Sequence, residues 1–371
     1  MLPSTTRALV TTLLEDARMV VELVEQPLPA PGPDDVVVQV EAAPINPSDL
    51  GLMFGPALMA QATYGPGRVE APVTPVAMKA LGARIGRPLG IGNEGAGVVV
   101  AAGANTQALI GRRVAAFAGA MYSQYRVIPA ADCMVLPEGV TPRQGAAAFV
   151  NPLTALAFIE TIRADGLSAM IHTAAASNLG QMLMRLCLAD GIPLVNIVRS
   201  AEQVALLHAM GAQYVLDSTS ATFSQELEQA VAETGARVVF DAIGGGTLLG
   251  MILTAMERAA TADGAYSRYG STQLKRGYVY GALDMAPITL PRTLGFVWDV
   301  SGWLLSPMME RLGPEARARM YGRVAAELTT TFACRYKGEL SLADALSREA
   351  VADYTRRATG SKFLILPSAP V

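Results

Sequence analysis

The stretch HTAAASNLGQ, residues 172–181, carries the residue types of an anion-binding turn. It follows the strand-like run LSAMI and precedes NLGQMLMRLCLADG, whose apolar spacing predicts a helix. A dinucleotide-binding turn needs three small residues, for the bend, for close approach to the phosphates and for helix–strand packing. Ala175, Ser177 and Gly180 stand at these positions, and Asn178 tolerates a left-handed backbone. Amide groups at the start of the helix would hold a phosphate, although a purely structural turn explains the same residues.

A positive side chain follows the next predicted strand, PLVNIV. An NAD-preferring fold commonly carries an acid there, whereas Arg199 can hold the 2'-phosphate of NADP. The sequence therefore favours NADPH as the cofactor, with a solvated surface arginine as the alternative. Ser200 and Gln203 have the spacing of a helix capping box, which gives Ser200 a structural role as well.

The elements around these residues change in character near residue 145. Before it, short apolar runs such as DVVVQVEA and GAGVVVAAG are separated by Gly and Pro, which is typical of a β-rich domain. After it, strand and helix patterns alternate, ending with a helix over LLGMILTAMERAA and a strand over GAYSRYG. This order predicts an α/β fold with a doubly wound parallel sheet.

Composition limits the classes of protein. The 371 residues are 51% hydrophobic and 16% charged, enough for a packed core and, by length, for two domains. A net charge of -3 offers no basic surface, so no nucleic-acid partner is expected. No apolar run is long enough for a membrane span, and no signal-peptide pattern is visible, so we expect a cytoplasmic protein.

Metal-ligand patterns are also missing from the sequence. Cys133, Cys187 and Cys334 lie far apart without metal-site spacing, and the two histidines, His172 and His208, fall in ordinary strand and helix patterns. We therefore expect no metal site.

Several ordered motifs together resemble the zinc-independent branch of the medium-chain dehydrogenase/reductase superfamily, which contains quinone oxidoreductases and 2-enoyl thioester reductases. The resemblance covers nearly the whole chain. Its segments AAPINPSD, NPLTA and NIVR read most like the mitochondrial-type 2-enoyl thioester reductases. The motifs are VEAAPINPSDL (40–50), GIGNEGAGVVVAAG (90–103), VNPLTA (150–155), the turn above, VNIVRS, YGST (269–272), SGWLLS (301–306) and TGSKFLIL (359–366).

The resemblance implies a GroES-like β-rich catalytic domain over residues 1–150 and a Rossmann NADP-binding domain over 151–304. A C-terminal segment, 305–371, completes the catalytic domain, and the active site is expected in the cleft. Such reductases are usually homodimers or homotetramers. Residues 277–290 are read either as a strand that pairs across a subunit interface or as an internal strand.

The zinc positions of the wider superfamily hold other residues in this chain. Where zinc-dependent relatives have Cys and His, this sequence has Asn46 and Asn93. A carboxamide is a poor zinc ligand, so metal-polarised alcohol oxidation is disfavoured. The resemblance then implies hydride transfer to a small molecule activated by its own carbonyl, either a quinone or an α,β-unsaturated compound.

One proton donor is also needed. In the enoyl reductases it is a tyrosine after the NPSD segment, which matches Tyr64 here, and a phenol with a pKa of about 10 can protonate an enolate-type carbon. An aromatic anchor is the alternative role of Tyr64, and Tyr122 is a reserve donor. Asn46 is expected near the cofactor ribose or the reacting centre, and residues 53–88 are expected to shape the substrate pocket.

The cofactor contacts implied by the resemblance extend over both predicted domains. A non-catalytic NADPH-binding sensor with the same fold remains the alternative to an enzyme. The expected contacts are Asn151 and Thr154 at the nicotinamide end, Ala176, Ser177, Asn178, Leu179 and Gly180 at the pyrophosphate, Arg199 and Ser200 at the 2'-phosphate, Tyr269 and Gly270 at the adenosine, Trp303 and Leu304 at the edge of the nicotinamide, and Lys362 near the phosphates.

Overall fold

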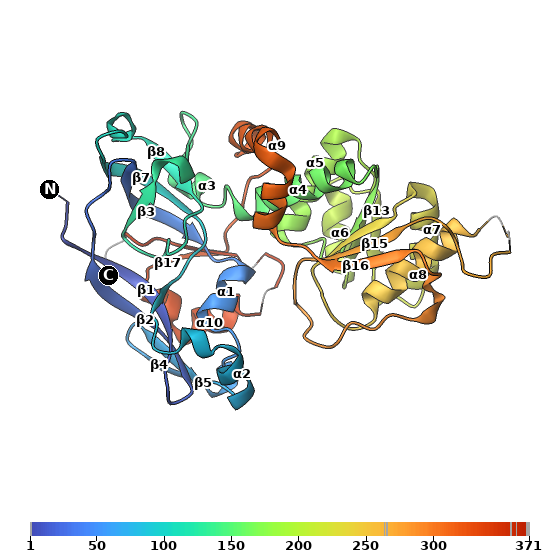
Figure 1. Ribbon diagram of the computed structural model, residues 1–371, viewed down its shortest axis with the longest axis horizontal. Coiled ribbons are helices and arrows are strands. Elements are labelled where there is room, and N and C mark those ends of the chain that lie inside the picture. Colours follow the sequence, from blue (N-terminus) through green and yellow to red (C-terminus); the bar gives the residue numbers. More distant parts are fainter. Residues whose placement is uncertain (1, 263, 265, 357, 361, 369–371) are drawn as a thin grey trace. The chain divides into compact units, whose positions relative to one another are not determined.

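A computed structural model describes residues 2–262, 264, 266–356, 358–360 and 362–368. The chain divides into two compact units, which are considered one at a time below (Figure 1). Unit 1 comprises Met1–Val150 and Val324–Val371, and unit 2 comprises Asn151–Arg323. The sequence-based limit at residue 305 falls at the start of helix α9 (Leu305–Glu327), which continues past the end of unit 2. The domain limits stay a proposal.

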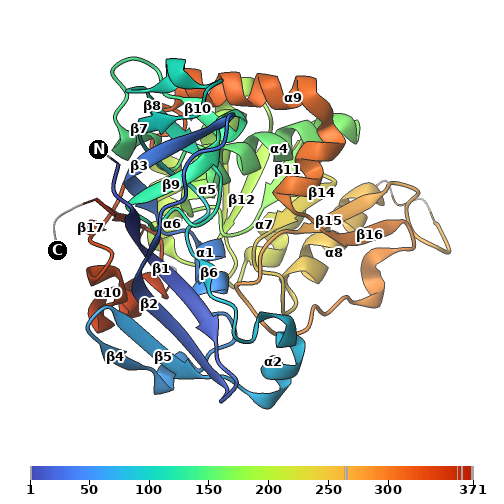
Figure 2. The same cartoon turned by 60° about the vertical axis from the view of Figure 1, so that its left-hand side comes forward.

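Unit 1 contains two sheets, in which all pairings are antiparallel except the one between β17 and β18 (Figure 2). The first sheet has the order β4-β5-β2-β1-β6, and the second has the order β10-β8-β7-β3-β18-β17, with β9 also paired to β3. The strands are β1 (Thr5–Leu13), β2 (Arg18–Pro27), β3 (Asp35–Pro44), β4 (Thr63–Gly65), β5 (Arg68–Pro72), β6 (Leu89–Gly90), β7 (Gly95–Ala102), β8 (Arg113–Ala116), β9 (Tyr125–Pro129), β10 (Cys133–Val135), β17 (Gly338–Leu340) and β18 (Phe363–Ile365).

Strand β3 is the centre of the second sheet. Its sequence DVVVQVEAAP is buried at most positions because it pairs with β7, β9 and β18. The core of unit 1 packs around it and includes residues from helices α1 and α10. The helices of this unit are α1 (Pro47–Met53), α2 (Pro75–Ala80), α3 (Pro142–Gly145) and α10 (Arg348–Tyr354).

Residues 53–88 form part of the first sheet. Strand β5 pairs with β2 over Arg68–Pro72, and β4 pairs with β5. Two ion pairs link β2 to β5: Arg18 with Glu70, and Glu22 with Arg68. The sheet therefore fixes the backbone of residues 63–65 and 68–72 within this segment.

Unit 2 contains a six-stranded parallel sheet with the order β13-β12-β11-β14-β15-β16. The predicted doubly wound parallel sheet is confirmed. Neighbouring residues of β14 face opposite sides: Val239 packs in the core with α7 and α8, whereas Phe240 stacks on Phe158 of α4. The elements are α4 (Val150–Ala164), β11 (Met170–His172), α5 (Asn178–Asp190), β12 (Leu194–Val198), α6 (Ala201–Ala209), β13 (Tyr214–Asp217), α7 (Phe223–Thr234), β14 (Val238–Asp241), α8 (Leu248–Ala260), β15 (Lys275–Val279), β16 (Trp298–Gly302) and α9.

The strand predicted over GAYSRYG, residues 264–270, is wrong. Its described residues form no strand, and the chain reaches the sheet only at β15. Tyr266 and Tyr269 are 92% and 60% exposed, whereas an inner strand of a parallel sheet would bury them. Residues 277–279 belong to β15, which lies between β14 and β16, so the internal-strand interpretation holds for that part of 277–290.

A buried ion pair holds the loop between α8 and β15. Lys275, which is fully buried, donates to Glu257 on α8, and Ser271 donates to the same carboxylate from its backbone N and its Oγ, both at 2.7 Å. Burial alone would raise the pKa of Glu257, but the bonds from Lys275 and Ser271 outweigh it and lower that pKa. A Cβ atom at Gly270 would lie 2.3 Å from Glu257 Oε1, so this position excludes a side chain.

No helix among the described residues combines the length and the apolar character that crossing a membrane requires.

Replacing Lys275 by Met should destabilise the protein strongly, because the Glu257 carboxylate would stay buried without its cation. We expect a loss of about 3–5 kcal/mol in the free energy of unfolding, measured by denaturant titration. Adding Glu257→Leu should recover much of this loss. As a control, Arg258→Met breaks an exposed pair with Glu228 and should cost less than about 1 kcal/mol. Equal costs for the two single variants would contradict the assigned role of the buried pair.

Candidate functional site

The turn between β11 and α5 has the geometry of a phosphate-binding turn. Ser177 is the N-cap of α5, and its Oγ accepts from the Gly180 amide at 3.1 Å. A Cβ atom at Gly180 would lie 2.2 Å from the carbonyl oxygen of Ala175, so only glycine lets the helix approach this closely. No hydrogen bond to another described residue is recorded for the amides of Ala176, Asn178 and Leu179. These groups are available to an anion at the positive end of the α5 dipole.

The left-handed residue of the turn is Ala174, with φ at 52°, whereas Asn178 lies in α5. Asn178, which tolerates a left-handed backbone, does not adopt one here. The bend comes earlier, where the amide of Ala175 reaches across to the carbonyl of Ile197 at 3.1 Å. This bond ties the turn to β12.

The carboxylate of Asp241, the last residue of β14, also holds this turn in place. Asp241 is buried and accepts from Thr173 Oγ1 at 2.7 Å and from the amides of Ile243 and Gly244. Thr173 Oγ1 accepts in turn from the Ala242 amide at 2.8 Å. These hydrogen bonds join the loop after β11 to the loop after β14 at the carboxyl edge of the sheet. Neither Thr173 nor Asp241 was predicted from the sequence, although Asp241 stands at the end of a predicted strand before a glycine turn.

Arg199 follows the last residue of β12, and its side chain is exposed. Ser200 caps α6, as predicted, by accepting from the Gln203 amide. The other half of the capping box differs, because the Gln203 side chain accepts from the Arg199 amide at 3.0 Å. The backbone of Arg199 is thus fixed while its guanidinium is exposed.

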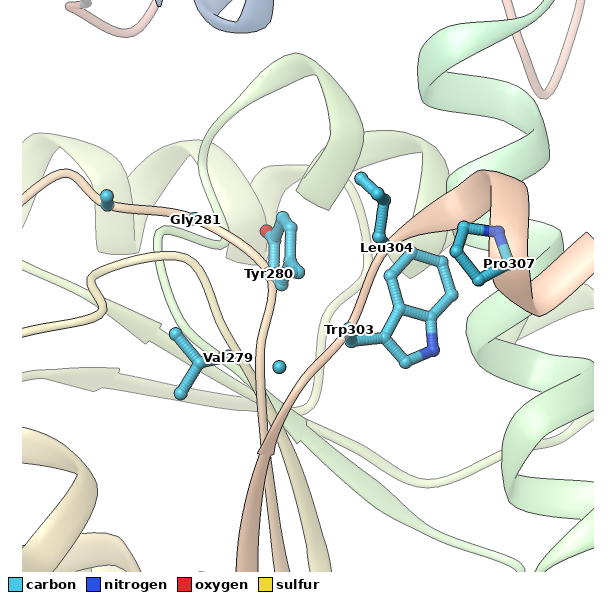
Figure 3. Close-up of a pocket in the computed structure, with 8 residues that line it drawn as sticks. Val279, Tyr280, Gly281, Trp303, Leu304 and Pro307 are labelled. Carbon is cyan, nitrogen blue, oxygen red and sulfur yellow. The ribbon is translucent and has the colours of Figure 1, made fainter. Parts of the chain in front are cut away.

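A cavity of about 480 Å³ opens at the carboxyl ends of β15 and β16, where open parallel sheets bind their ligands. Figure 3 shows Tyr280, Trp303 and Leu304 around it. Trp303 is 6% exposed and packs edge-on against Phe158, whereas Leu304 is 68% exposed. The structure thus makes Trp303 both a core residue and part of the cavity wall. The full lining is Val279, Tyr280, Gly281, Ala282, Gly302, Trp303, Leu304 and Pro307.

His172 backs this wall from the end of β11. Its Nε2 lies 2.7 Å from the hydroxyl of Tyr280, and the two rings stack. Burial lowers the pKa of His172 to about 3, so the ring is neutral near pH 7. It therefore acts as a neutral hydrogen-bonding partner of Tyr280.

The remaining expected contacts in unit 2 lie on two other elements. Thr154 is buried on α4, and Asn151, next to its start, is half-buried. Tyr269 is exposed with its ring edge-on to Phe296, and Gly270 adopts a positive φ of 84° against Glu257.

Unit 1 contains a buried polar cluster around Glu94. Its Oε1 accepts from Asn46 Nδ2 at 2.9 Å, and its Oε2 accepts from the backbone amides of Phe149 and Val150, both at 2.9 Å. Glu94 is fully buried and Asn46 is 1% exposed. Asn46 was predicted as a site residue but Glu94 was not, although Glu94 follows Asn93 within the motif GIGNEGAGVVVAAG.

Asp49 is the second acid of this cluster. It accepts from the backbone amides of Asn46 and Asn93, each at 2.8 Å, at the start of α1. Burial raises the pKa of Asp49 to about 6 although both hydrogen bonds oppose the shift. Asn93 Nδ2 donates to Ser48 Oγ, so the side chains of Asn46 and Asn93 are both engaged within the protein.

Lys362 directly precedes β18, the strand that pairs with β3. Strand β18 runs antiparallel to β3 with Leu364 opposite Pro44, and Ile45 N donates to Phe363 O at 2.9 Å. Asn46 and Lys362 lie just outside this pairing, at the same end of it. Lys362 is 7% exposed, and its Nζ has no hydrogen-bond partner among the described residues.

The two tyrosines considered as proton donors lie in different surroundings. Tyr64 is half-buried in edge strand β4, with the Arg348 guanidinium 4.5 Å from the centre of its ring. Tyr122 is fully buried, donates to Pro44 O at 3.0 Å, and has its pKa raised well above the usual value by burial. Tyr122 is therefore part of the core, whereas Tyr64 is partly buried at its margin.

Within the described residues, no three His, Cys, Asp or Glu side chains group as a metal site would require. The absence of a metal stays a prediction, which metal analysis can test.

Two family models match the chain: the alcohol dehydrogenase GroES-like domain over residues 32–138, and the zinc-binding dehydrogenase domain over residues 179–264. The first covers much of the β-rich unit and the second much of the parallel sheet, so the predicted pair of a GroES-like and a Rossmann domain is confirmed.

Three individual proteins are also similar. A quinone oxidoreductase of Pseudomonas aeruginosa is 29% identical over 43% of this chain and 50% of its own length. The human mitochondrial enoyl-[acyl-carrier-protein] reductase is 30% identical over 58% of this chain and 53% of its own length. A solved structure from Mesorhizobium loti, described as an NADPH:quinone reductase, has a TM-score of 0.74 at 26% identity and covers 99% of this chain and 100% of that one.

The chain spans about half the length of the curated relatives it matches. The matched domains occur in the expected order on the expected folds. The protein therefore belongs to the medium-chain dehydrogenase/reductase superfamily and is similar to its quinone oxidoreductases and enoyl reductases.

Proposed function

We propose that the protein is a zinc-independent, NADPH-dependent oxidoreductase that transfers hydride to a conjugated carbonyl acceptor: a quinone, an enone or a 2-enoyl thioester. The observation that carries the proposal is the turn before α5, with its engaged Ser177, its close-packed Gly180 and its unengaged amides. The names of the similar quinone and enoyl reductases support the class of acceptor.

The residues present fit the cofactor at its charged end. The amides of Ala176, Asn178 and Leu179 would bind the pyrophosphate, and the exposed guanidinium of Arg199 would bind the 2'-phosphate. Ser200 is fixed as a helix cap, so its role there is to orient the loop. The Nζ of Lys362, which is buried and has no hydrogen-bond partner among the described residues, would offer a further positive charge to a ligand.

The nicotinamide end would lie against less polar groups. Trp303 and Leu304 line the cavity at the carboxyl edge of the sheet and would cover the ring, and Asn151 and Thr154 would contact it from α4. Tyr269 and Gly270 would flank the adenosine. Bound NADPH supplies the hydride.

The protein itself then has two tasks: to orient the acceptor and to provide one proton. Tyr64 is the proposed donor, because it is only partly buried and its phenol can give a proton to the atom that hydride transfer makes basic: the α-carbon of an enone or enoyl thioester, or an oxygen of a quinone. An acceptor that carries its own conjugated carbonyl needs no metal to polarise it. Asn46 and Asn93 are consistent with such a metal-free reaction, because carboxamides are poor zinc ligands.

A non-catalytic NADPH-binding sensor is the second candidate, since the same turn and arginine would bind the cofactor without any acceptor. A cytoplasmic location and a homodimeric or homotetrameric state stay predictions from the sequence.

The proposal is tested by mixing chelator-dialysed protein with NADPH and a panel of quinones, enones and enoyl thioesters, and following the absorbance of the reduced nicotinamide. We expect acceptor-dependent oxidation by protein that contains no stoichiometric metal. NADPH binding without oxidation of any kind would favour the sensor. Loss of turnover on chelation, restored by zinc, would overturn the metal-free mechanism.

Replacing Arg199 by Ala should weaken NADPH binding about ten- to a hundredfold and leave NADH binding within about twofold. The reason is that a charge-assisted bond to the 2'-phosphate, worth about 1.5–3 kcal/mol, exists only with the phosphorylated cofactor. Fluorescence titration of both cofactors measures the two dissociation constants. Arg258→Ala on α8 is the matched control and should change neither. If Arg199→Ala weakens both cofactors equally, the 2'-phosphate contact lies elsewhere.

A further inference from the structure

Among the described residues, the side chain of His172 hydrogen-bonds only to Tyr280, and the tautomer of its ring decides which of the two donates. The His172 Nε2 atom lies 2.7 Å from the Tyr280 hydroxyl oxygen, whereas Nδ1 is buried and has no hydrogen-bond partner among the described residues. Because burial keeps the imidazole neutral near pH 7, only one ring nitrogen carries a proton. The other nitrogen is an acceptor.

The surroundings of His172 favour the tautomer with the proton on Nε2. The residue is fully buried, with its ring packed against Phe158, so Nδ1 is either an unpaired N–H donor or an unpaired acceptor. Buried backbone N–H groups without an acceptor are rarer than carbonyl groups without a donor, and a ring N–H is subject to the same cost. The proton therefore belongs on Nε2, and this nitrogen donates to the Tyr280 hydroxyl oxygen.

This direction leaves the proton of the Tyr280 hydroxyl available to another acceptor. Tyr280 lines the cavity at the carboxyl end of β15 (Figure 3). Its hydroxyl has no second hydrogen-bond partner among the described residues. A hydroxyl that accepts one hydrogen bond becomes a stronger donor in the next, because the two bonds polarise each other.

Tyr280 is also the lining side chain that can meet the polar part of a ligand. The indole Nε1 of Trp303, the other side-chain donor of the lining, is directed to Thr161 Oγ1 at 3.4 Å. The remaining lining residues have apolar side chains or are glycine. A mostly apolar group with one hydrogen-bond acceptor therefore fits these walls. A carbonyl group conjugated to a ring or a double bond is such a group.

We propose that Tyr280 donates a hydrogen bond to the carbonyl oxygen of a ligand in this cavity, with the Nε2–H of His172 holding the hydroxyl in the donating orientation. His172 is a positioning residue, since it acts through Tyr280. The inference rests on the proposed NADPH-dependent function, which brings two carbonyl groups: the carboxamide of the nicotinamide and the conjugated carbonyl of the acceptor. It adds the side chain that recognises a carbonyl group and the residue that orients this side chain.

The Tyr280→Phe variant keeps the ring and removes only the donor. If the nicotinamide carboxamide is the partner, the dissociation constant of NADPH should rise about tenfold, while that of 2'-phospho-ADP-ribose, which lacks the nicotinamide, stays within about twofold. If the acceptor carbonyl is the partner, NADPH binding stays within about twofold and kcat/KM for the acceptor falls about tenfold. Either result supports the inference. Tyr278→Phe removes a hydroxyl bonded to Asp165 outside the lining, and this matched control should change neither constant.

The His172→Leu variant tests the positioning role. Without the Nε2–H donor the Tyr280 hydroxyl can turn, and we expect about a threefold loss in the same constant that Tyr280→Phe changes. In the double variant His172→Leu/Tyr280→Phe, the loss should be about that of Tyr280→Phe alone, because His172 acts only through the hydroxyl. Losses that multiply in the double variant would contradict the positioning role.

Nitrogen NMR of the ligand-free protein tests the tautomer separately from any ligand. The chain has two histidines, so a spectrum of His172→Leu assigns the ring signals of both. His208 Nδ1 lies 2.9 Å from the carbonyl oxygen of Ala212 and must donate to it, which makes His208 a reference for the Nδ1–H tautomer. At about pH 8, where an ordinary histidine is neutral, we expect the proton of His172 on Nε2. A proton on Nδ1 would overturn the assignment.

These measurements separate the inference from the function on which it rests. If the wild type binds NADPH but Tyr280→Phe changes neither NADPH binding nor turnover, the hydroxyl is not a donor to the ligand and the inference alone fails. If the wild type binds no NADPH, the proposed function fails, whereas the ring signals of His172 still decide its tautomer.

Discussion

Buried carboxylates need hydrogen-bond donors, and meeting this need fixes the loops that carry the candidate site. The described residues include four buried acids: Asp49, Glu94, Asp241 and Glu257. Each accepts from at least one backbone amide. An acid without such partners would cost several kcal/mol or take up a proton, so each loop is held in the conformation that supplies its donors.

Glu94 and Asp241 do this in the same way in the two units. Glu94 joins Asn46 to the start of α4, and Asp241 joins the Thr173 turn to the loop after β14. A carboxylate whose lone pairs accept from N–H and O–H donors offers fewer of them to a cation. The hydrogen bonds that order these loops therefore favour a site that orients its ligands by hydrogen bonding over a site that binds a cation.

The sequence predicted those parts of the structure that depend on local pattern. The order of strands and helices after residue 150 indicated the parallel sheet, and the spacing of small residues identified Gly180, whose close contact with Ala175 the structure reproduces. It misplaced a strand at 264–270, because alternating small and aromatic residues also suit an exposed loop. The Asn46–Glu94 hydrogen bond could not be predicted from the sequence, because 48 residues separate the partners and the β3–β7 pairing brings them together.

The turn between β11 and α5 shows which position of the dinucleotide-binding motif still requires glycine when the other positions hold different small residues. Ala174 takes a left-handed conformation that an alanine adopts at a cost of about 1–2 kcal/mol. That strain is sustained by its neighbours, because the Ala175 amide bonds to β12 and Thr173 bonds to Asp241 on either side of it. Glycine is therefore needed only where the helix packs on the strand, at Gly180, and the bend can be imposed by the surrounding sheet.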